Sequence, residues 1–239
     1  GRPSMGKTAL ALNFASTACK NGKGVLIFSL EMGRETLMAR IAAAECGIDA
    51  KKVMNPAELS EADFGKIIDK AAYISDNWNL HVEYEPSIKP SEMAAKARRC
   101  KVKYGIDLII IDYIQLMSGE GSGGRAGENR QQEISFITRE LKKLAGNLNV
   151  PVIALSQLSR SVEQRPNKRP MLSDLRESGS IEQDADIVLM LYRDEYYNPD
   201  GDKFTELIIA KNRNGEIGMV KLFFISQFTK FADFTNKYS

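Results

Sequence analysis

The first eight residues carry the strongest chemical signal in the chain. Gly1, Gly6, Lys7 and Thr8 fill the fixed positions of the pattern G-x-x-x-x-G-K-[ST], and a largely apolar helical segment follows. Such glycines let backbone N–H groups close around phosphate oxygens, the lysine reaches the β- and γ-phosphates, and the threonine hydroxyl ligates Mg²⁺. The alternative is a chance Gly-rich turn. We predict a nucleotide-binding loop made of Gly1, Arg2, Pro3, Ser4, Met5, Gly6, Lys7 and Thr8.

Two acidic residues follow apolar segments that read as buried strands. Asp112 comes after residues 108–111, and Glu31 comes after residues 25–30. Ligands of α/β sheets bind at the carboxyl ends of the strands, so both carboxylates should face the crevice that contains Thr8. We expect Asp112 to hold Mg²⁺ and Glu31 to deprotonate an attacking water. The alternative for Glu31 is a solvated acid at the start of a loop.

Three further polar residues are candidates for contacts with a γ-phosphate. Gln157 follows a third apolar segment, and its amide can donate to a phosphate and accept from a water. Lys211 and Arg213 precede Asn214-Gly215, a hairpin signal at a sheet edge. Cations at an edge lie away from the loop of their own subunit, so they are better placed to reach a neighbour's γ-phosphate. On the residues alone, a charged hairpin turn remains the simpler interpretation of this pair.

The stretch 156–180 is rich in phosphate-binding donors. It contains five Arg and Lys residues against three acidic ones, and it ends in Arg176-Glu177-Ser178-Gly179-Ser180. Backbone N–H, hydroxyl and guanidinium groups suit phosphodiesters rather than base edges. The alternative is a solvated loop. A second basic run at 96–103 is interpreted as the charged surface of a helix.

Alternating apolar segments must position these residues. Helices are predicted at 6–19, 34–44, 60–74, 91–104 and 128–148, and apolar strands at 25–30, 80–84, 108–112, 150–156 and 187–192. Ser60, with Asp63 three residues on, is expected to cap the third of these helices. This β-α-β alternation predicts an α/β fold with a parallel sheet covered by helices. Segments 205–210 and 219–225 should add an antiparallel hairpin at one edge. No repeat or Pro- or Ser-rich linker divides the 239 residues, so a single domain is predicted.

Composition excludes several classes of protein. The net charge of +2 excludes a polycationic coat for nucleic acid. No apolar run approaches the roughly 20 residues of a bilayer-spanning helix. Three separated cysteines suit reduced thiols in a cytosolic protein, and the single histidine, His81, argues against Ser-His-Asp catalysis and multi-ligand zinc sites. His81 is expected only to pack in its strand.

Five segments together resemble the DnaB family of bacterial and phage replicative helicases. GRPSMGKT is similar to the family's Walker A motif, SLEM to the segment with the catalytic glutamate, LIIIDYIQLM to Walker B and SQLSR to the third motif. The most diagnostic segment is RPMLSDLRESGSIEQDADIVLMLYRDEYY, which is similar to the fourth motif. The resemblance covers essentially the whole chain as the family's C-terminal RecA-like motor domain.

The resemblance implies a hexameric ring that uses ATP and Mg²⁺, moves 5′ to 3′ on single-stranded DNA, and works with a primase and a helicase loader in the cytoplasm. It assigns catalysis to Lys7, Glu31, Gln157, Lys211 and Arg213, with the last two acting in trans. It assigns metal binding to Thr8 and Asp112, and contacts with the DNA backbone to Arg176, Glu177 and Gly179. The Gly-rich segment 118–127 corresponds to a further loop near the central channel.

The sequence also departs from the family pattern. The relatives have an N-terminal helical domain and a linker helix that this sequence lacks, and the strand that normally enters the loop is missing before Gly1. We therefore expect a fragment that is unstable or poorly active alone. Two rival functions remain open. One is another RecA-like ATPase, such as a strand-exchange or circadian-clock-type protein, and the other is a nucleotide-binding ring scaffold that does not hydrolyse ATP.

Overall fold

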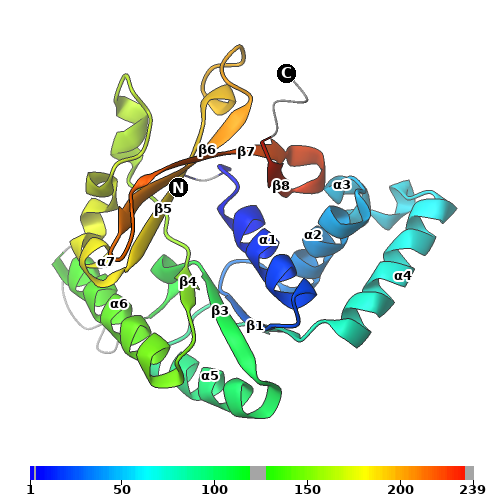
Figure 1. Cartoon of the computed structure of the whole chain (residues 1–239), viewed down its shortest axis with the longest axis horizontal. Coiled ribbons are helices and arrows are strands. Elements are labelled where there is room, and N and C mark those ends of the chain that lie inside the picture. Colours follow the sequence, from blue (N-terminus) through cyan, green and yellow to red (C-terminus); the bar gives the residue numbers. More distant parts are fainter. Residues whose placement is uncertain (3, 119–127, 235–239) are drawn as a thin grey trace.

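A parallel sheet of four strands forms one half of the molecule (Figure 1). The computed structural model describes residues 1–2, 4–118 and 128–234, without the side chains of 128–129 and 176–178. The register places Ser29 opposite Asp112, so the carboxyl ends of two central strands meet at one edge. In spatial order the strands are β2 (Leu80–Tyr84), β1 (Gly24–Ser29), β3 (Ile106–Asp112) and β4 (Val152–Ala154).

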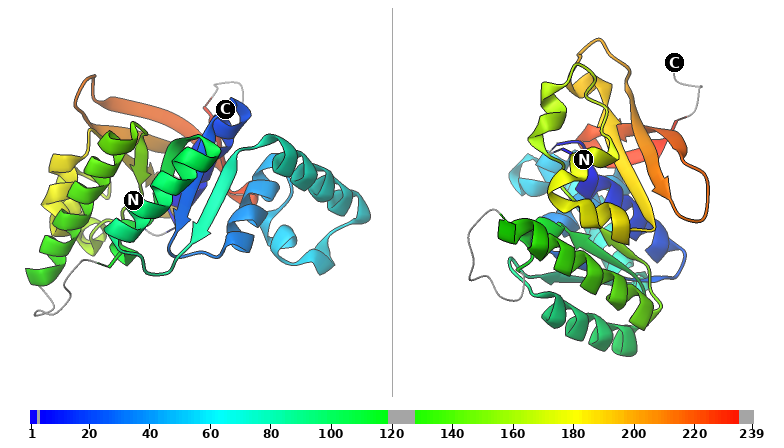
Figure 2. Two further views of the ribbon diagram at one scale, coloured as in Figure 1. Left: turned by 90° about the horizontal axis from the view of Figure 1, so that it is seen from below. Right: turned by 90° about the vertical axis from the view of Figure 1, so that its left-hand side faces the viewer.

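Helices cover both faces of this sheet, as the β-α-β alternation predicts. Val25 and Ile27 point to one face, whereas Leu26 and Phe28 point to the other, because successive side chains of a strand alternate. The first face packs against α1 (Lys7–Lys20), α2 (Arg34–Cys46) and α4 (Glu61–Asn77). The second packs against α5 (Pro90–Tyr104) and α6 (Glu128–Leu148), which lie next to each other in the lower half of the right-hand view of Figure 2.

The remaining strands form a second, antiparallel sheet. Its order is β5 (Ile187–Arg193), β6 (Phe204–Asn212), β7 (Gly218–Ile225) and β8 (Lys230–Asp233). The predicted hairpin is confirmed as β6 and β7, but it belongs to this separate sheet and does not extend an edge of the parallel one. The prediction that segment 187–192 belongs to the parallel sheet is wrong, because β5 pairs antiparallel with β6. A fully apolar run indicates a buried strand, but it does not fix the direction of the partner.

Helix α1 joins the two sheets. Opposite to the side that packs on β1 and β3, its residues Ala9 and Leu10 pack with Met5 against Leu191 of β5 and Phe231 of β8. The side chain of Asn13 also donates to the carbonyl oxygen of Phe231 at 2.8 Å. The helix therefore lies between both sheets, and its first residues come from the predicted nucleotide-binding loop.

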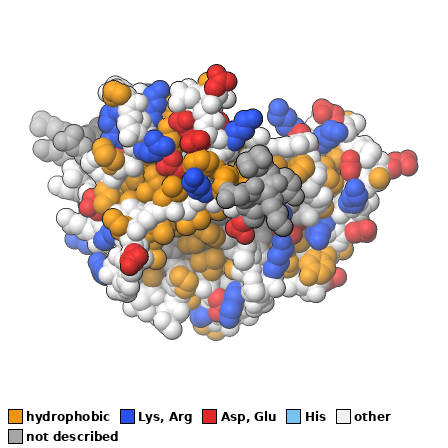
Figure 3. Space-filling model, turned by 45° about the horizontal axis from the view of Figure 1, so that its top comes forward, with side chains coloured by type: hydrophobic (Ala, Val, Ile, Leu, Met, Phe, Trp, Pro, Cys, Tyr) orange, Lys and Arg blue, Asp and Glu red, His pale blue; other side chains and the backbone are white. Residues whose placement is uncertain are grey.

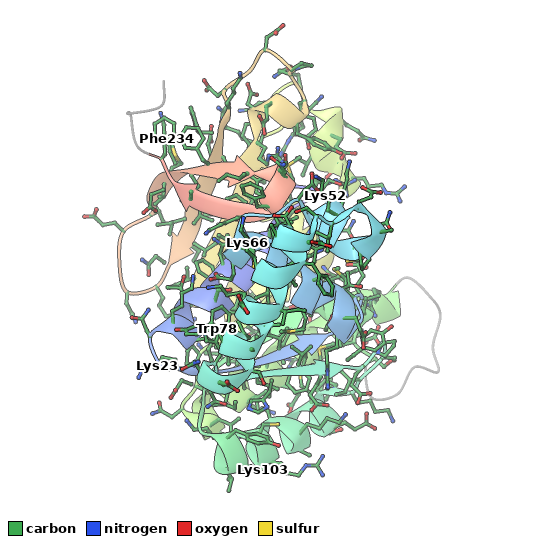
Figure 4. All side chains as sticks on the ribbon, turned by 90° about the vertical axis from the view of Figure 1, so that its right-hand side faces the viewer. Lys23, Lys52, Lys66, Trp78, Lys103 and Phe234 are labelled. Atoms are coloured by element: carbon green, nitrogen blue, oxygen red, sulfur yellow. The ribbon has the colours of Figure 1, made fainter. Side chains whose placement is uncertain are left out.

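Shorter elements complete the chain. They are α3 (Ala50–Met54), α7 (Gly179–Asp184) and the 3₁₀ helices η1 (Pro56–Glu58), η2 (Ile114–Leu116), η3 (Arg160–Gln164), η4 (Leu172–Ser178), η5 (Asp194–Tyr196) and η6 (Ser226–Phe228). The predicted Ser60 cap of α4 is confirmed, since its hydroxyl accepts from the Asp63 N–H at 3.1 Å. Figure 4 shows α4 on the outside of the molecule, with Lys66 on the helix and Trp78 at its end.

Predictions about the isolated histidine and the cysteines agree with the structure. The ring of His81 stacks on that of Tyr104 with 3.9 Å between centroids, so this histidine packs as expected. All three cysteines are free thiols. Within the ranges given above, no helix is both long and apolar enough to cross a bilayer.

Candidate nucleotide-binding and catalytic site

The predicted nucleotide-binding loop ends in a glycine that cannot be replaced without strain. Gly6 caps α1 with φ of 91°, in the left-handed region that favours glycine. A Cβ added there would lie 2.9 Å from a ring carbon of Phe231, closer than real Cβ contacts. Both the backbone and the aromatic ring therefore require glycine at this position, and the turn directs the start of α1 towards the loop. The positive end of a helix favours an anion there.

Lys7 lies with its ammonium group inside this loop. Its Nζ donates to the carbonyl oxygens of Gly1 and Arg2, each at 2.9 Å. Burial lowers the pKa of Lys7, while the nearby carboxylates of Asp112 and Glu31 act in the opposite direction. The lysine therefore stands where a phosphate in the loop would be within its reach.

Thr8 and Asp112 meet as the sequence predicted. The Thr8 hydroxyl donates to Oδ2 of Asp112 at 2.7 Å, although 104 positions separate the two residues. Asp112 is 3% exposed. Burial raises the pKa of its carboxyl group; the Thr8 hydrogen bond opposes that rise, Glu31 adds to it, and Lys7 opposes it. A buried carboxylate beside a hydroxyl offers oxygen atoms to a cation, and the ammonium group beside them offers a positive charge to a phosphate.

The donor set suits Mg²⁺ rather than a metal held entirely by protein side chains. No group of three or more His, Cys, Asp or Glu side chains converges within the described parts of the chain. Mg²⁺ takes oxygen ligands and usually keeps several waters, binding through one or two protein oxygens and the phosphates of a nucleotide. Thr8 and Asp112 supply that kind of pair, so the residues present fit the ion.

Glu31 lies beside this pair at the end of β1. It is exposed, and its charge acts on the pKa values of Lys7, Asp112 and Tyr113. The carboxyl ends of β1 and β3 are also tied together, since the Leu30 N–H donates to the carbonyl oxygen of Asp112 at 2.8 Å. The prediction that Glu31 shares the crevice of Thr8 and Asp112 therefore agrees with its position.

Gln157 is held by a residue that the sequence analysis missed. The Gln115 amide nitrogen donates to the Gln157 carbonyl at 3.2 Å and to the Ser156 hydroxyl at 2.8 Å, and Gln115 Oε1 accepts from the Gln157 N–H at 3.3 Å. Gln115 stands in η2, three residues after Asp112. The position of a polar residue just past the carboxyl end of a buried strand, the argument used for Glu31, could have identified it.

Two residues of the loop do not turn their side chains to the nucleotide site. Arg2 reaches Glu163 and the carbonyl oxygen of Leu158 instead. Met5 is 2% exposed and belongs to the cluster between α1 and the second sheet. Their assignment to nucleotide binding is corrected for the side chains, because the motif leaves both positions free to pack. Ser4 is exposed and its carbonyl accepts from Arg193 at 3.5 Å, while Pro3 lies outside the described residues.

Lys211 and Arg213 lie at the end of β6, where their contacts are with α7 and the residues that follow it. Lys211 Nζ donates to the carbonyl oxygens of Glu182 at 2.5 Å and Ala185 at 2.7 Å. Arg213 pairs with Asp186 at 3.1 Å and donates to the carbonyl oxygen of Gln183 at 3.3 Å. These partners all belong to segment 182–186 rather than to the nucleotide-binding loop. The expected position at a sheet edge is wrong, because β6 lies between β5 and β7 and the pair stands at the end of an interior strand. The contacts of the pair are nevertheless separate from Thr8 and Asp112.

The predicted DNA-binding stretch, residues 156–180, contains short helices, and part of its positive charge is neutralised by ion pairs. Arg176 and Glu177 lie in η4, and Gly179 begins α7; the first two side chains are not described. Arg165 pairs with Asp174 at 2.8 Å, and Arg169 pairs with Glu206 at 2.7 Å, so part of the basic excess is neutralised. On the face in Figure 3, cations are scattered among acids rather than gathered in one patch. Of segment 118–127, residues 119–127 lie outside the described ranges.

Comparison with known proteins extends these observations to a family. The chain matches the model of the DnaB-like helicase C terminal domain over residues 1–233. It is 51% identical over 240 residues to the replicative DNA helicase DnaB of Geobacillus stearothermophilus, covering 99% of this chain and 52% of that protein. It is 50% identical to the replicative DNA helicase DnaC of Bacillus subtilis (strain 168), with the same coverage. The chain thus spans about half the length of these relatives.

Solved structures give the same result for the fold. One solved ATPase domain superposes with a TM-score of 0.92 and 42% identity, covering 98% of this chain and 82% of that chain. A DnaB-like replicative helicase, solved together with its interactions with primase, gives 0.91 and 41%, covering 98% and 56%. The resemblance and the RecA-like α/β fold inferred from the sequence are confirmed, and the chain belongs to the family of DnaB-like helicase C-terminal domains.

Proposed function

We propose that this chain is the ATP-hydrolysing motor of a replicative DNA helicase. The observation that carries the proposal is the Thr8–Asp112 hydrogen bond of 2.7 Å beside Lys7, at the carboxyl ends of the parallel strands. A hydroxyl, a carboxylate and an ammonium group converge there at the start of a helix. This is the arrangement that a nucleoside triphosphate with Mg²⁺ requires.

Each side chain has a separate task in the proposed reaction. Lys7 and the loop N–H groups bind phosphate oxygens, and Thr8 with Asp112 holds the metal. Bound Mg²⁺ would supply charge neutralisation at the β- and γ-phosphates. Glu31 accepts the proton of the attacking water, and Gln157 contacts the γ-phosphate. Most of the acceleration in phosphoryl transfer comes from such positioning and charge stabilisation.

We further propose that six copies form a ring in which Lys211 and Arg213 act on the neighbour's γ-phosphate. Their location at the end of β6, with contacts to segment 182–186 rather than to their own loop, supports action in trans. Single-stranded DNA would pass through the ring as the ring moves 5′ to 3′, with the DNA phosphates near Arg176, Glu177 and Gly179. The paired charges around this stretch suit a ring that encircles its strand, since topological enclosure needs few phosphate contacts per subunit.

Partners and location follow from the same proposal. A primase is the partner named for one solved relative, and we propose that this protein also works with a primase and a helicase loader. We place it in the cytoplasm at the replication fork. Duplex unwinding without strand exchange would separate a helicase from a recombinase with a similar ATPase fold.

The decisive test replaces the proposed base. Glu31→Gln keeps the shape and polarity of the side chain but removes the carboxylate, so the variant should bind ATP as the wild type does and lose turnover by roughly 10²- to 10⁴-fold. Binding is measured by titration with a fluorescent ATP analogue, and turnover by phosphate release with single-stranded DNA present. A ring scaffold that does not hydrolyse ATP would show no turnover to lose, and that result would exclude the motor.

A further inference from the structure

The side chain of Arg2 connects the nucleotide-binding loop to the segment that follows β4. Its Nε donates to Oε1 of Glu163 at 2.9 Å, and its Nη1 donates to the carbonyl oxygen of Leu158 at 3.0 Å. The Arg2 side chain is 10% exposed, against 41% for Glu163. A guanidinium group at this depth must keep its charge and its N–H groups paired. The loop therefore carries a buried cation whose side-chain contacts reach into another segment.

The bound segment is the one that contains Gln157. Leu158, the next residue, offers its carbonyl to Arg2 and donates its N–H to the Gly1 carbonyl at 3.4 Å. Both backbone polar groups of Leu158 are thus bound to the nucleotide-binding loop. Because the two residues share a peptide bond, Gln157 cannot move far from the loop while these contacts persist.

A second anchor holds Gln157 from the opposite side. The Gln115 side chain bonds both the N–H and the carbonyl of Gln157, and Gln115 follows Asp112 by three residues. The Arg130 guanidinium in turn donates to the Gln115 carbonyl. Gln157 therefore lies between an anchor from the phosphate-binding side and an anchor from the metal-binding side.

We propose that Arg2 is a positioning residue for recognition of the γ-phosphate. It fixes the distance between the loop, which binds the β-phosphate, and Gln157, which contacts the γ-phosphate. The inference rests on the proposed function, because it requires ATP in the loop and Gln157 as the sensor. Arg2 itself touches neither the nucleotide nor the water; it acts through Leu158.

This role differs from that of a residue that merely stabilises the fold. The contacts to the β-phosphate come from the loop N–H groups and Lys7, so they do not depend on where Gln157 stands. Loss of Arg2 should therefore spare ADP binding while weakening ATP recognition and turnover. A displacement of about 1 Å at a reacting centre can lower the rate by roughly 10²-fold.

The test compares three variants in the full chain. Arg2→Gln removes both contacts, Arg2→Lys keeps the charge but not the two-point geometry, and Glu163→Gln keeps an acceptor oxygen but removes the charge. Lys20→Gln is the matched control, since it breaks the Lys20–Glu45 pair of 2.7 Å at the other end of α1. The readouts are kcat and KM for ATP, ATP and ADP affinities by fluorescence titration, and the thermal melting curve.

We expect Arg2→Gln to lower kcat by roughly 10- to 100-fold and to reduce the preference for ATP over ADP, with ADP affinity within about threefold of wild type. Arg2→Lys should recover part of kcat, and Glu163→Gln should show the same changes at smaller size. Lys20→Gln should leave all three nucleotide readouts unchanged.

Two outcomes would overturn the inference. One is an equal loss of ATP and ADP affinity in Arg2→Gln, which would make Arg2 a general support of the loop. The other is an unchanged kcat. If Arg2→Gln does not fold, Glu163→Gln decides the matter, because unaltered discrimination between ATP and ADP in that variant contradicts the proposal. Turnover in the wild type and its loss in Glu31→Gln test the proposed function separately, so the two ideas can fail independently.

Discussion

Two sets of proposed catalytic groups are built very differently: one lies where the nucleotide-binding loop meets the end of β3, and the other lies at the end of β6. In the first, Asp112 is 3% exposed and bonded to Thr8. In the second, Arg213 and its partner Asp186 are 50% and 51% exposed. The first set is fixed by the register of a parallel sheet. The second is held by a solvated ion pair and by carbonyl oxygens of segment 182–185.

This difference indicates which of the proposed contacts with nucleotide and metal one subunit can make by itself. Of the groups proposed to bind phosphate and metal, Asp112 is buried and already bonded to Thr8, so these two are held together within one subunit. Exposed ion pairs contribute little to stability, so a cation held by one can change partners at small cost. Arg213, the proposed arginine finger, is half exposed and thus lies on a surface that a second copy could approach.

The largest loss of turnover is expected from a substitution in the exposed set at the end of β6. Arg213→Ala should lower turnover by about 10³- to 10⁵-fold, the usual contribution of an arginine finger. Mixing this variant with Glu31→Gln subunits should restore part of the activity. In such mixed rings, some sites combine an intact Glu31 with the intact Arg213 of a neighbour. Phosphate release measured against mixing ratio checks this, and a mixture as inactive as either parent would show that Arg213 acts within its own subunit.

The next largest loss of turnover is expected from a substitution at Asp112, in the buried set. Asp112→Asn keeps an acceptor for the Thr8 hydroxyl but removes the charge that holds the metal, so turnover should fall by roughly 10²- to 10³-fold. Because the metal-binding groups all belong to one subunit, a neighbour cannot repair a site that carries this substitution. Phosphate release over a Mg²⁺ titration measures the loss, and full rescue by excess Mg²⁺ alone would count against a direct ligand role.

The same variant should be more stable than wild type at neutral pH. Burial raises the pKa of Asp112 from its ordinary 3.8, so the folded protein binds this proton more tightly than the unfolded chain does. The free energy of unfolding therefore falls as pH rises from the ordinary pKa through the raised one. Asparagine lacks this titration, so its Tm should exceed that of the wild type above the window. Melting curves across pH should show the gap closing below the ordinary pKa.

The smallest effect concerns the surface pair. Asp186→Asn removes a carboxylate whose pKa is lowered by Lys142 and Arg213, and both partners of the Arg213 pair are about half exposed. The free energy of unfolding should change by less than about 1 kcal/mol. Chemical denaturation measures it. A loss several times larger would mean that the exposed set is fixed as firmly as the buried one, and the contrast between them would disappear.

The sequence predicted the buried set because parallel strands leave little freedom. Once residues 25–30 and 108–111 are taken as neighbouring strands, their carboxyl ends must meet, which brings Glu31 and Asp112 to the same crevice. Thr8 joins them through the nucleotide-binding motif at the start of α1. The Ser60 cap followed from equally local chemistry. Both predictions concern positions where the local backbone geometry determines what the side chain contacts.

Predictions were weaker where the pattern leaves the side chain free. The loop motif fixes Lys7 and Thr8 but not Arg2 or Met5, and the structure uses these two for an ion pair and for core packing. Apolarity identified β5 as a strand, but it predicted neither its antiparallel partner nor the exposure of Ile187 and Leu189. The place of Gln115 just past the end of a buried strand could have indicated a role at the site, but its hydrogen bonds to Gln157 belong to the tertiary fold and are not visible in the sequence.

The position of α1 between the two sheets has a mechanical consequence. One side of the helix is packed on β1 and β3, and the other on β5 and β8. If the antiparallel sheet shifts relative to the parallel one, α1 should tilt, because it packs on both. The displacement should be largest at the ends of the helix. One of these ends adjoins the phosphate-binding loop. We therefore expect a shift of the second sheet, such as one caused by a neighbouring subunit at the end of β6, to change the affinity of the loop for the nucleotide.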